Sequence, residues 1–560
     1  MSRISSTRWL LQPAAPEGLS EKLGVPPVIA QVFYHRGIQD ALTLDTFLSN
    51  DRSSLHDPFL MAGMGAAVER IRKAVESDEK VAVFGDFDVD GVTATAILVK
   101  TLEILGAAVI PYIPHRVRDG HGLNEAAIRS LSSQSISLIV TVDCGITSQA
   151  EVTLANSLGM QVIVTDHHKM PLNPPEAYTI VSPVPSEGYP FRQLTGAGVA
   201  FKLAQALLSK IGQAPDEFLF QMAALGTVGD VAPVLGENRI LVKEGLEALH
   251  KYPSAGISEL CRAAGIESYA VDTETISFAL APRLNASGRL DDANTSYRLL
   301  SAHTREEAAP LADELEMLNR ERQSLTEAAT STAREEILAQ DTTPPLLFVA
   351  HKEFNPGVNG LVASKLVEEF YRPSIIASLG KIAIASARSI PEFDIAGAIA
   401  QCGDLLLRHG GHPRAAGFTA DIDKLPAVKQ RLLDIAGDRL SGVDLRPRIL
   451  VDVDMPIAAL DGKVIRWLSR LQPYGEGNAL PIFLSRHVDV VHVFPQGGNG
   501  RHLHLVLKSG NVVWDAVVFN CAETGFPHAS RLDLVYTLGS NNRQGQRTLS
   551  IHILDAVVSE

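Results

Sequence analysis

Short apolar runs alternate with longer amphipathic stretches between residues 80 and 170. The four runs are KVAVF (80–84), AAVIPYI (107–113), SLIVTV (137–142) and QVIVT (161–165). Between them lie helical patterns, two of which stop at Gly106 and Gly159, and Asn124 is suited to cap a third. Because parallel strands need helical crossovers, this alternation predicts a parallel, doubly wound α/β sheet.

Residues 304–340 have a different pattern, with leucines near helical spacing and a capping box formed by Thr304 and Glu307. The segment TTPP (342–345) then breaks the pattern. We therefore expect one long helix that connects two folded units. A second α/β region follows at about 346–440.

After RPR (446–448), apolar and polar residues alternate with the period of strands. The five runs are IFLSRHVDVVHVF, HLHLVLK, VVWDAVVF, LDLVYTL and TLSIHIL. Five short strands in this stretch predict a small β-barrel of the OB type.

The chain has 560 residues, which is too long for a single hydrophobic core. We expect an N-terminal helical segment (1–65), a first α/β domain (66–303), the connecting helix (304–341), a second α/β domain (342–440) and the barrel (447–560). No apolar run is long enough to span a membrane, and the N-terminus lacks the apolar core of a signal peptide.

Charge and cysteine content bear on partners and compartment. A net charge of −14 argues, by itself, against a nucleic-acid-binding protein. However, residues 441–560 contain eleven basic and eleven acidic residues, so residues 1–440 carry the entire excess. The four cysteines lie far apart in the sequence and form no CxxC pair, which is typical of the reducing cytoplasm.

Acidic residues collect where the predicted strands end. Asp86, Asp88 and Asp90 follow the first run, Asp143 ends the third, and Asp166, His167 and His168 follow the fourth; Asp230 follows a predicted helix. Open α/β sheets bind ligands at the carboxyl ends of their strands. Carboxylates with one or two imidazoles suit Mn²⁺ or Mg²⁺ better than Zn²⁺.

The stretch FGDFDVDG (84–91) also resembles the start of an EF-hand calcium loop. An EF-hand loop requires glutamate at its twelfth position, where this chain has Ile97. An EF-hand loop also follows a helix, whereas this stretch follows a predicted strand. An acidic turn that caps the next helix explains one or two of the aspartates, but not three together with strand-end acids elsewhere. For the adjacent His167 and His168 we expect opposite directions, one toward a metal and one toward substrate phosphate.

In order and spacing, GDFDVDG, VDCG, DHH and GTVGD resemble the four acidic motifs of the DHH phosphoesterase superfamily. PRLNASGRLDDA (282–293), GVNGLVASKL (357–366), SARSI (386–390), GGHPRAAGF (410–418) and QPYGEGNALPIF (472–483) extend the likeness to its bacterial single-strand-specific exonucleases. The resemblance covers nearly the whole chain. It implies a DHH domain, a DHH-associated domain and an OB-fold, and 5′→3′ release of 5′-mononucleotides from single-stranded DNA in repair and recombination.

The resemblance also implies roles for particular residues and two ions of Mn²⁺ or Mg²⁺. The implied metal ligands are Asp88, Asp90, Asp143, His167 and Asp230, with Asp143 shared by both ions. The implied catalytic residues are Asp86, Asp143 and His168, with Asp166 in support. The implied substrate contacts are Arg116, Arg283, Asn285, Arg289, Ser386, Arg388, Gly411 and His412.

Five positions depart from the pattern of the superfamily. Phe84 stands where many members have histidine, so one ion is expected to have a ligand fewer. Asn355 replaces another histidine, His121 a tyrosine and Gly229 an alanine. Ala387 replaces a glycine, which puts a Cβ where we expect the backbone to approach phosphate.

The predicted barrel offers aromatic and basic side chains for a single strand. These are Phe483, Phe494, Trp514, Phe519, Arg501, Lys508, Arg543 and Arg547. We expect most of the aromatics, about three in four, to belong to the core. By resemblance, the partners are single-stranded DNA, single-strand-binding protein and a RecQ-type helicase; we expect no membrane partner and a monomer.

Three alternative functions remain at this point. Another DHH enzyme, acting on short RNA, cyclic dinucleotides or pyrophosphate, shares the acidic motifs but generally lacks the barrel and the RLNASGR segment. A non-catalytic scaffold would have lost ligands, whereas every expected carboxylate is present. A hydrolase using Cys144 lacks a recognisable histidine partner, and the neighbouring Asp143 should raise the thiol pKa.

Overall fold

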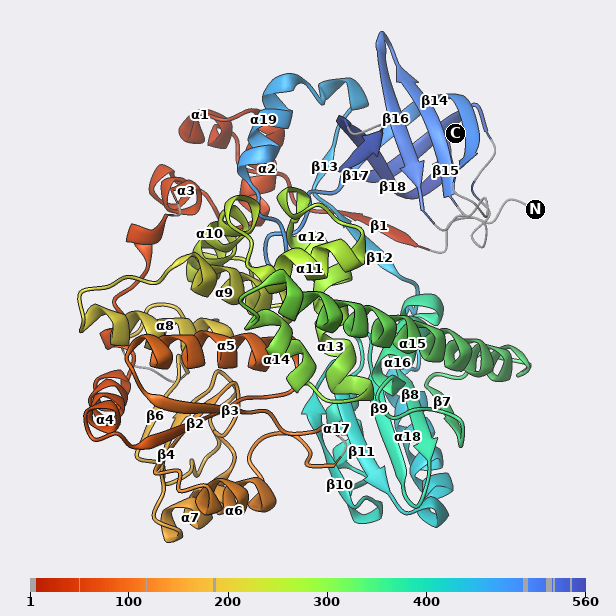
Figure 1. Cartoon of the computed structure of the whole chain (residues 1–560). Helices are drawn as coiled ribbons and strands as arrows, with labels where there is room; N and C mark the ends of the chain where they lie inside the picture. Colours follow the sequence, from red (N-terminus) through yellow and green to blue (C-terminus); the bar gives the residue numbers. More distant parts are fainter. Residues whose placement is uncertain are drawn as a thin grey trace.

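The structure is a computed structural model that describes residues 7–559 except 50, 117, 185–187, 497–501, 520–525, 527–528 and 544–545; for 496, 540–543 and 546–548 it describes the backbone alone. Two α/β units lie side by side below a β-barrel, and one long helix crosses between them (Figure 1). This arrangement confirms the predicted fold class.

The first unit is built on five parallel strands in the order β3-β2-β4-β5-β6. They are β2 (Lys80–Phe84), β3 (Ala108–Tyr112), β4 (Leu138–Val142), β5 (Gln161–Thr165) and the unpredicted short β6 (Thr179–Val181). In chain order this is the doubly wound order 2-1-3-4-5, whose direction of winding reverses between β2 and β4. A ligand site is therefore expected at the carboxyl ends of β2 and β4.

Both faces of this sheet are covered because successive side chains point to opposite sides. Val81 and Val83 join the core beneath α4 (Met64–Glu76), α5 (Val89–Ile104) and α8 (Gly196–Ser209). Ala82 and Phe84 join the core beneath α6 (Glu125–Ser133) and α7 (Gln149–Ser157). Asn124 caps α6, as predicted, by accepting a hydrogen bond from Ala127 N.

More helices complete the first unit and lead to the second. They are α9 (Glu217–Gly229), α10 (Gly236–Lys251), α11 (Ala255–Ala264), α12 (Thr273–Thr275), a π-helical stretch (Ile276–Leu280), α13 (Ala281–Leu290), α14 (Asn294–Leu300) and α15 (Arg305–Leu338). Helix α15 is the predicted connecting helix, and Thr304 caps it. The second half of the predicted capping box is displaced by one residue: the Glu307 carboxylate accepts a hydrogen bond from His303 N instead of from Thr304 N.

The second unit has a mixed sheet in the order β10-β11-β9-β8-β7, in which only β7 and β8 are parallel. The strands are β7 (Leu347–His351), β8 (Ser374–Leu379), β9 (Ala383–Arg388), β10 (Arg408–His412) and β11 (Ala415–Ala420). The helices are α16 (Asn359–Phe370), α17 (Ile395–Ala400) and α18 (Leu425–Leu440).

The barrel closes because β14 pairs with both β15 and β17. It comprises β14 (Phe483–Gln496), β15 (His502–Ser509), β16 (Val512–Val518), β17 (Arg531–Arg543) and β18 (Gln546–Val558), preceded by β12 (Arg448–Val451), β13 (Val453–Asp454) and α19 (Gly462–Arg470). The five strands are the predicted ones, but three of them are long, with 13 or 14 residues. Bulges in β14 and β18 bend these strands around the barrel.

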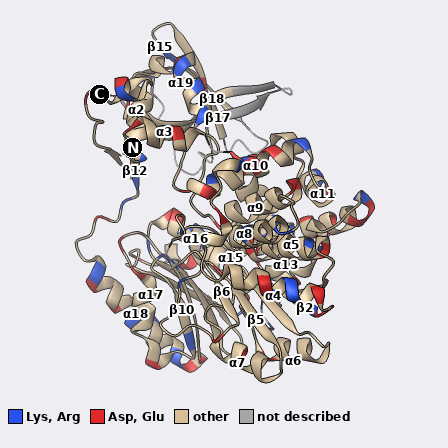
Figure 2. Cartoon of the chain, turned by 90° about the vertical axis from the view of Figure 1, so that its left-hand side faces the viewer, with Lys and Arg blue, Asp and Glu red and all other residues tan. Residues whose placement is uncertain are grey.

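The N-terminal segment packs against the C-terminal part of the chain, which the sequence pattern did not predict. Strand β1 (Arg8–Leu11) pairs in parallel with β12. Helices α1 (Leu19–Leu23), α2 (Pro27–His35) and α3 (Ala41–Leu48) share one hydrophobic core with α19 and the barrel. Figures 1 and 2 show these helices beside α19, above the two α/β units.

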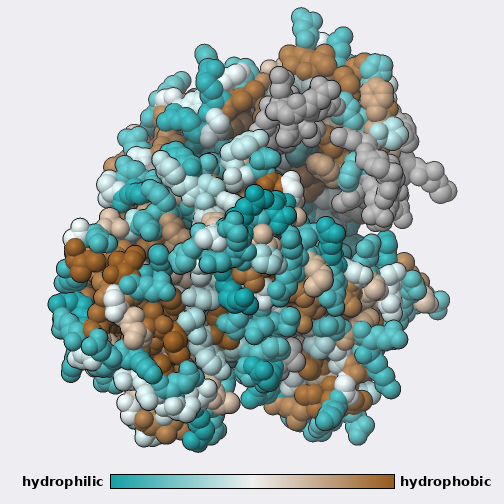
Figure 3. All heavy atoms as spheres, viewed as in Figure 1, coloured by the Kyte–Doolittle hydropathy of each residue, from teal (hydrophilic) through white to brown (hydrophobic). Residues whose placement is uncertain are grey.

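The surface is mixed in polarity. Lysine, arginine, aspartate and glutamate are interspersed over most helices (Figure 2). In Figure 3, polar side chains cover the region of α13–α15, and apolar ones gather over the edge strand β3. Among the helices that the structure describes, none has the length and apolar character needed to cross a membrane.

Candidate functional site

The strand-end carboxylates and histidines come together at the carboxyl edge of the first sheet. Three overlapping groups each bring possible ligand atoms within 4.8 Å of one another. They are Asp86, Asp88 and Asp143; Asp90, His167 and Asp230; and Asp143, His167 and His168. All predicted metal ligands are thus in one place, and Asp143 belongs to two of the groups.

Two of these carboxylates are held by helix N-termini. Asp88 caps α5 and accepts hydrogen bonds from Asp90 N and Gly91 N. Asp90 accepts from Gly196 N at 2.7 Å and Ala197 N at 2.8 Å, at the start of α8. Main-chain amides at a helix start stabilise an anion, so they hold the Asp90 carboxylate in a defined orientation. The sequence analysis missed this support, although the small residues of TGAG (195–198) point to a close approach there.

Asp143 follows β4 in a strained conformation. Its φ of +60° lies in the left-handed region, which non-glycine residues rarely adopt. The side chain is buried, and a Cβ at Gly196 would lie only 2.3 Å from its own Cβ. His167 Nε2 is 3.1 Å from Asp143 Oδ1, but the angles do not make a hydrogen bond, and this oxygen has no donor. Strain of this kind is found at functional sites.

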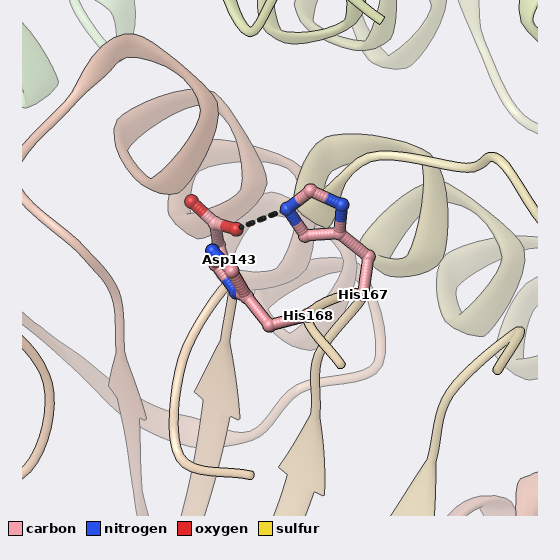
Figure 4. Close-up of side chains that lie close together, drawn as sticks. All are labelled: Asp143, His167 and His168. Atoms are coloured by element: carbon pink, nitrogen blue, oxygen red, sulfur yellow. Dashed lines mark ion pairs between the residues drawn. The ribbon is translucent and has the colours of Figure 1, made fainter. Parts of the chain in front are cut away.

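The two histidines lie side by side rather than pointing apart. His167 points toward Asp143, and His168 comes from the same loop (Figure 4). Their ring centroids are 4.5 Å apart, and His168 Nδ1 donates to Asp166 Oδ1 at 2.7 Å. The prediction of opposite directions is wrong because β5 ends at Thr165, so the alternation of a strand no longer applies.

Burial and mutual repulsion change the protonation of the cluster. Burial raises the pKa of Asp86, Asp90 and Asp143 well above the usual range, and neighbouring carboxylates raise it further. Burial, and to a lesser extent the charge of the neighbouring Asp88, raises the pKa of Asp230 to about 7.

The two histidines shift in opposite directions. The hydrogen bond to Asp166 raises the pKa of His168 to about 9, whereas burial lowers that of His167 to about 4. His167 is therefore neutral near pH 7, which is the form that binds metals.

The donor set fits a divalent cation. Asp86 Oδ1 and Asp143 Oδ1 are buried without any hydrogen-bond partner. A buried carboxylate oxygen that lacks both proton donor and cation is costly. Oxygen-rich groups with one imidazole suit Mn²⁺ or Mg²⁺, and these groups could hold such ions.

His121 is a site residue that the sequence analysis treated only as a departure from the family pattern. Its Nε2 lies 3.4 Å from Asp86 Oδ2. Its ring stands edge-on to Phe87 at 5.9 Å and to His168 at 6.0 Å, and more than half of the side chain is exposed.

Three arginines from distant segments cluster near the carboxylates: Arg116 and Arg289 lie close enough to interact with Asp88, and Arg388 lies close to both of them. Arg116 lies over the Phe87 ring, and Arg289 donates to Gly357 O. Burial lowers the pKa of Arg289 to about 10, and both Arg116 and Arg388 lower it further. Among the described residues, none of these three guanidinium groups forms an ion pair. They form a positive cluster with no anion of its own.

The register of the second sheet decides which predicted contacts share a face. Arg388 pairs with Ala415, which pairs with His412, and residues opposite each other in antiparallel strands point the same way. Ser386 lies two residues before Arg388, on the same face. These three side chains are therefore placed together.

Ala387 and Gly411 lie on the opposite face, both in register with Ala416. The Ala387 side chain is fully buried in the core, so its Cβ does not reach the face of Arg388. The expectation that this methyl group stands where the backbone approaches phosphate is therefore wrong. Gly411, with φ +138°, could contact a ligand only through its backbone.

Two predicted substrate contacts, Arg283 and Asn285, are held by hydrogen bonds within the protein. Arg283 donates to Glu316 of α15 at 2.7 Å and to Ala279 O at 2.8 Å. The Asn285 side-chain oxygen accepts from Val89 N at 2.9 Å, which fixes the start of α5 beside Asp88. Arg283 thus ties α13 to α15, and Asn285 ties α13 to the start of α5, next to Asp88.

Three departures have local explanations. The Phe84 side chain is fully buried and stacks on Tyr112 with centroids 5.0 Å apart, so it belongs to the hydrophobic core. A Cβ at Gly229 would lie 2.3 Å from Val89 Cγ1, so glycine leaves room for this valine. The Asn355 side-chain oxygen accepts a hydrogen bond from Gly357 N and so holds the turn at residues 355–357.

The barrel exposes two of its four predicted aromatics. Phe483 is fully buried and Trp514 packs partly against the core, whereas Phe494 and Phe519 are 49% and 51% exposed. Phe494 stacks on His504, and Phe519 contacts His502. We expected about three in four of these aromatic side chains in the core, and that share was too high. Lys508 is exposed; Arg501 and the side chains of Arg543 and Arg547 lie outside the described residues.

Three sequence families match the chain. Residues 80–227 match the DHH family, N-terminal domain; residues 343–438 the DHHA1 domain; and residues 451–555 the RecJ OB domain. The single-stranded-DNA-specific exonuclease RecJ of Bacillus subtilis (strain 168) is 38% identical, covering 99% of this chain and 71% of the relative. RecJ of Escherichia coli (strain K12) is 32% identical, covering 94% and 95%.

Solved structures agree with the sequence matches. The crystal structure of RecJ from Thermus thermophilus in complex with Mn²⁺ matches with a TM-score of 0.84 at 31% identity, covering 99% of this chain and 80% of that chain. The Mg²⁺ complex matches with a TM-score of 0.79 at 30% identity, covering 99% and 79%. The resemblance inferred from the motifs is confirmed, and this chain belongs to the RecJ family of DHH proteins.

Proposed function

We propose that this protein is a single-strand-specific exodeoxyribonuclease that works in the 5′→3′ direction and releases 5′-mononucleotides. The observation that carries the proposal is the juxtaposition of buried carboxylates with arginines that have no anion of their own. Such a cleft accepts a cation on one side and a phosphate on the other. The names of the relatives support single-stranded DNA as the substrate.

Two divalent ions, Mn²⁺ or Mg²⁺, would be held by the overlapping ligand groups. Asp86, Asp88 and Asp143 would hold one ion, and Asp90, His167 and Asp230 the other. Asp143 lies within reach of both sets and would be shared. When bound, such ions stabilise the negative charge that develops on the phosphate oxygens and on the attacking water.

The protein's own groups position the substrate. Asp166 holds His168 Nδ1, which keeps this imidazole protonated near pH 7 and leaves Nε2–H to donate to a phosphate oxygen. Arg289 and Arg388 would bind phosphate oxygens through their planar guanidinium groups. Ser386 and His412, on the same face as Arg388, would contact the same nucleotide.

The barrel would hold the strand beyond the cleft. Phe494 and Phe519 are exposed aromatics on which bases can stack, and each stacked base contributes about 1–3 kcal/mol. Stacking needs unpaired bases, which favours single strands over duplex. The near-neutral charge of residues 441–560 fits binding by stacking more than by a strongly basic groove.

A role in DNA repair and recombination, in the cytoplasm, follows from the proposed substrate. Single-strand-binding protein and a RecQ-type helicase are proposed partners, because both act where single strands are exposed. We propose that the protein acts as a monomer, since the ligand groups and the arginines all come from one chain.

One assay tests the proposal. The protein is incubated with Mn²⁺ and end-labelled single-stranded DNA, duplex, short RNA, a cyclic dinucleotide or pyrophosphate. Release of mononucleotides from the 5′ end of single-stranded DNA, lost in Asp143→Ala, is the expected result. A preference for dinucleotides or pyrophosphate would contradict it, and DNA binding without cleavage would indicate a scaffold.

A further inference from the structure

The segment that leads from α19 to the barrel contacts the first α/β unit immediately after the proposed ligand Asp230. We define the docking loop as residues 472–478 and the strap as residues 231–235, which lead from Asp230 to α10. Val234 N donates to Glu476 O at 2.8 Å. A Cβ at Gly475 would lie 2.5 Å from Val234 Cγ2, so glycine allows this close contact. The docking loop therefore lies directly on the strap.

A buried arginine fastens the docking loop. Arg239, in the first turn of α10, is 2% exposed and donates to Gln472 O at 2.7 Å and Pro473 O at 3.0 Å. Among the described residues it forms no ion pair; it also donates to Phe47 O and Arg470 O, and its guanidinium lies 4.2 Å from the centre of the Phe47 ring. Asn478 holds the loop from within by donating to Pro473 O. An arginine buried against carbonyls and an aromatic ring is costly to undock, because its charge would lose these partners.

The strap begins in a strained conformation. Val231, directly after Asp230, has φ +58°, which is a genuine outlier for a β-branched residue. Its side chain is 66% exposed, so packing of the side chain does not explain the conformation. Strain persists only where the surrounding structure holds the backbone in place. The docking loop holds the strap from its other end.

The strap is also tied to the support of a second ligand. Asn238 Nδ2 donates to Pro233 O at 3.0 Å and to Gln193 O at 2.6 Å. Gln193 lies three residues before Gly196, whose N–H holds Asp90. The strap thus connects the docking loop to both Asp230 and the start of α8.

We propose that the docking loop positions Asp230 for metal binding, and that Arg239 is a positioning residue for the metal centre although it touches no ligand. The inference rests on the metal ligands assigned under Proposed function. It makes the base of the barrel a part of the metal centre's support. Loss of the docking contacts lets the strap relax and moves Asp230 away from Asp90 and His167.

Calorimetric titration of the metal-free full chain with Mn²⁺, without substrate, tests this role. Arg239→Ala should weaken one Mn²⁺ site about tenfold, the size of effect expected when a group that orients a ligand is lost. Arg239→Lys should restore part of the affinity, because one ammonium can still reach a carbonyl. Arg36→Ala is the matched control, since Arg36 donates to Ala479 O, just beyond the docking loop, without touching the strap.

A second pair of variants carries the test if Arg239→Ala does not fold. Gly475→Ala pushes a methyl group into Val234 and should weaken the same site, whereas Gly437→Ala has open space and should not. Wild-type Mn²⁺ affinity in a folded Arg239→Ala or Gly475→Ala protein overturns the inference. A wild-type chain that binds Mn²⁺ but leaves DNA intact refutes the proposed function alone, and one that binds no Mn²⁺ refutes both.

Discussion

The two sides of the candidate site differ in chemistry, one rich in carboxylates and the other in arginines, and among the described residues no close ion pair joins Arg116, Arg289 or Arg388 to the carboxylates. On one side, burial raises the pKa of Asp90 and Asp143. On the other, burial lowers the pKa of Arg289 and Arg388, and neighbouring arginines lower it further. Buried charges in proteins are normally paired, because unpaired ones destabilise the fold. The difference teaches that each side has an unmet charge of its own, which agrees with the proposed cation on one side and the proposed phosphate on the other.

The two sides also differ in how they are held. Asp88 and Asp90 are fixed by main-chain amides at helix starts, which leaves their carboxylates little freedom. Arg116, Arg289 and Arg388 come from a loop, from α13 and from β9, and are long side chains. The carboxylate side is therefore fixed by the main chain, whereas the arginine side is assembled from three separate segments.

The largest expected effect comes from removing the carboxylate shared by the ligand groups. Asp143→Ala should lower the cleavage rate by about a thousandfold or more, because it removes ligands from both ions. Single-turnover assays with labelled single-stranded DNA measure this. Asp438→Ala, an exposed aspartate on α18, should retain the wild-type rate. Substantial cleavage by Asp143→Ala would refute the assigned role.

The arginine side should act on the substrate and not on the metal. Arg388→Ala should lower kcat/KM about a hundredfold and leave Mn²⁺ affinity unchanged, because the proposed role of Arg388 is to bind phosphate and it is not among the possible metal ligands. Steady-state kinetics and calorimetry measure the two effects. Arg431→Ala, whose arginine forms an exposed pair with Asp404, serves as control. A parallel loss of Mn²⁺ affinity would show that the two sides are not independent.

Acidification should weaken the carboxylate side first. The pKa of Asp230 is about 7, so protons compete with Mn²⁺ below that pH, and affinity should fall about tenfold per pH unit. This raised pKa stabilises the metal-free fold at low pH, and that stabilisation is lost as pH rises through about 7. Calorimetry from pH 5 to 8 measures the change. Asp230→Asn should flatten it, and an unchanged profile would contradict the assignment.

The barrel should affect long strands only. Phe494→Ala or Phe519→Ala should weaken the binding of long single strands about tenfold, through lost stacking, and spare the cleavage of very short ones. Fluorescence anisotropy over a series of strand lengths tests this, with the exposed Val513→Ala as control. These substitutions are cleaner than deleting residues 447–560, which would expose the core shared with α1–α3.

The smallest effect concerns the packing beneath the metal side. Gly229→Ala should destabilise the fold by about 1–3 kcal/mol, because its Cβ would overlap Val89. Val89→Ala should remove most of this cost in the double variant. Denaturant unfolding of the four proteins gives the coupling energy. Additive effects would contradict the contact.

Local sequence patterns were sufficient to predict much of the fold of this protein. Strand and helix periods along residues 80–170 predicted the first sheet, and the rule for parallel strands placed the acids at its carboxyl edge. The order of the motifs along the chain was sufficient to identify the family. These features follow from sequence because periodicity and capping act over a few residues, and chain order constrains a doubly wound sheet.

Only the tertiary structure decided what depends on distant partners. The amides that hold Asp90 lie more than a hundred residues away, at Gly196 and Ala197. Strand register put Arg388 and His412 on one face and Ala387 on the other. The pairing of β1 with β12 and the docking loop on the strap join still more distant segments. Such contacts depend on how finished elements pack, and no local pattern encodes that packing.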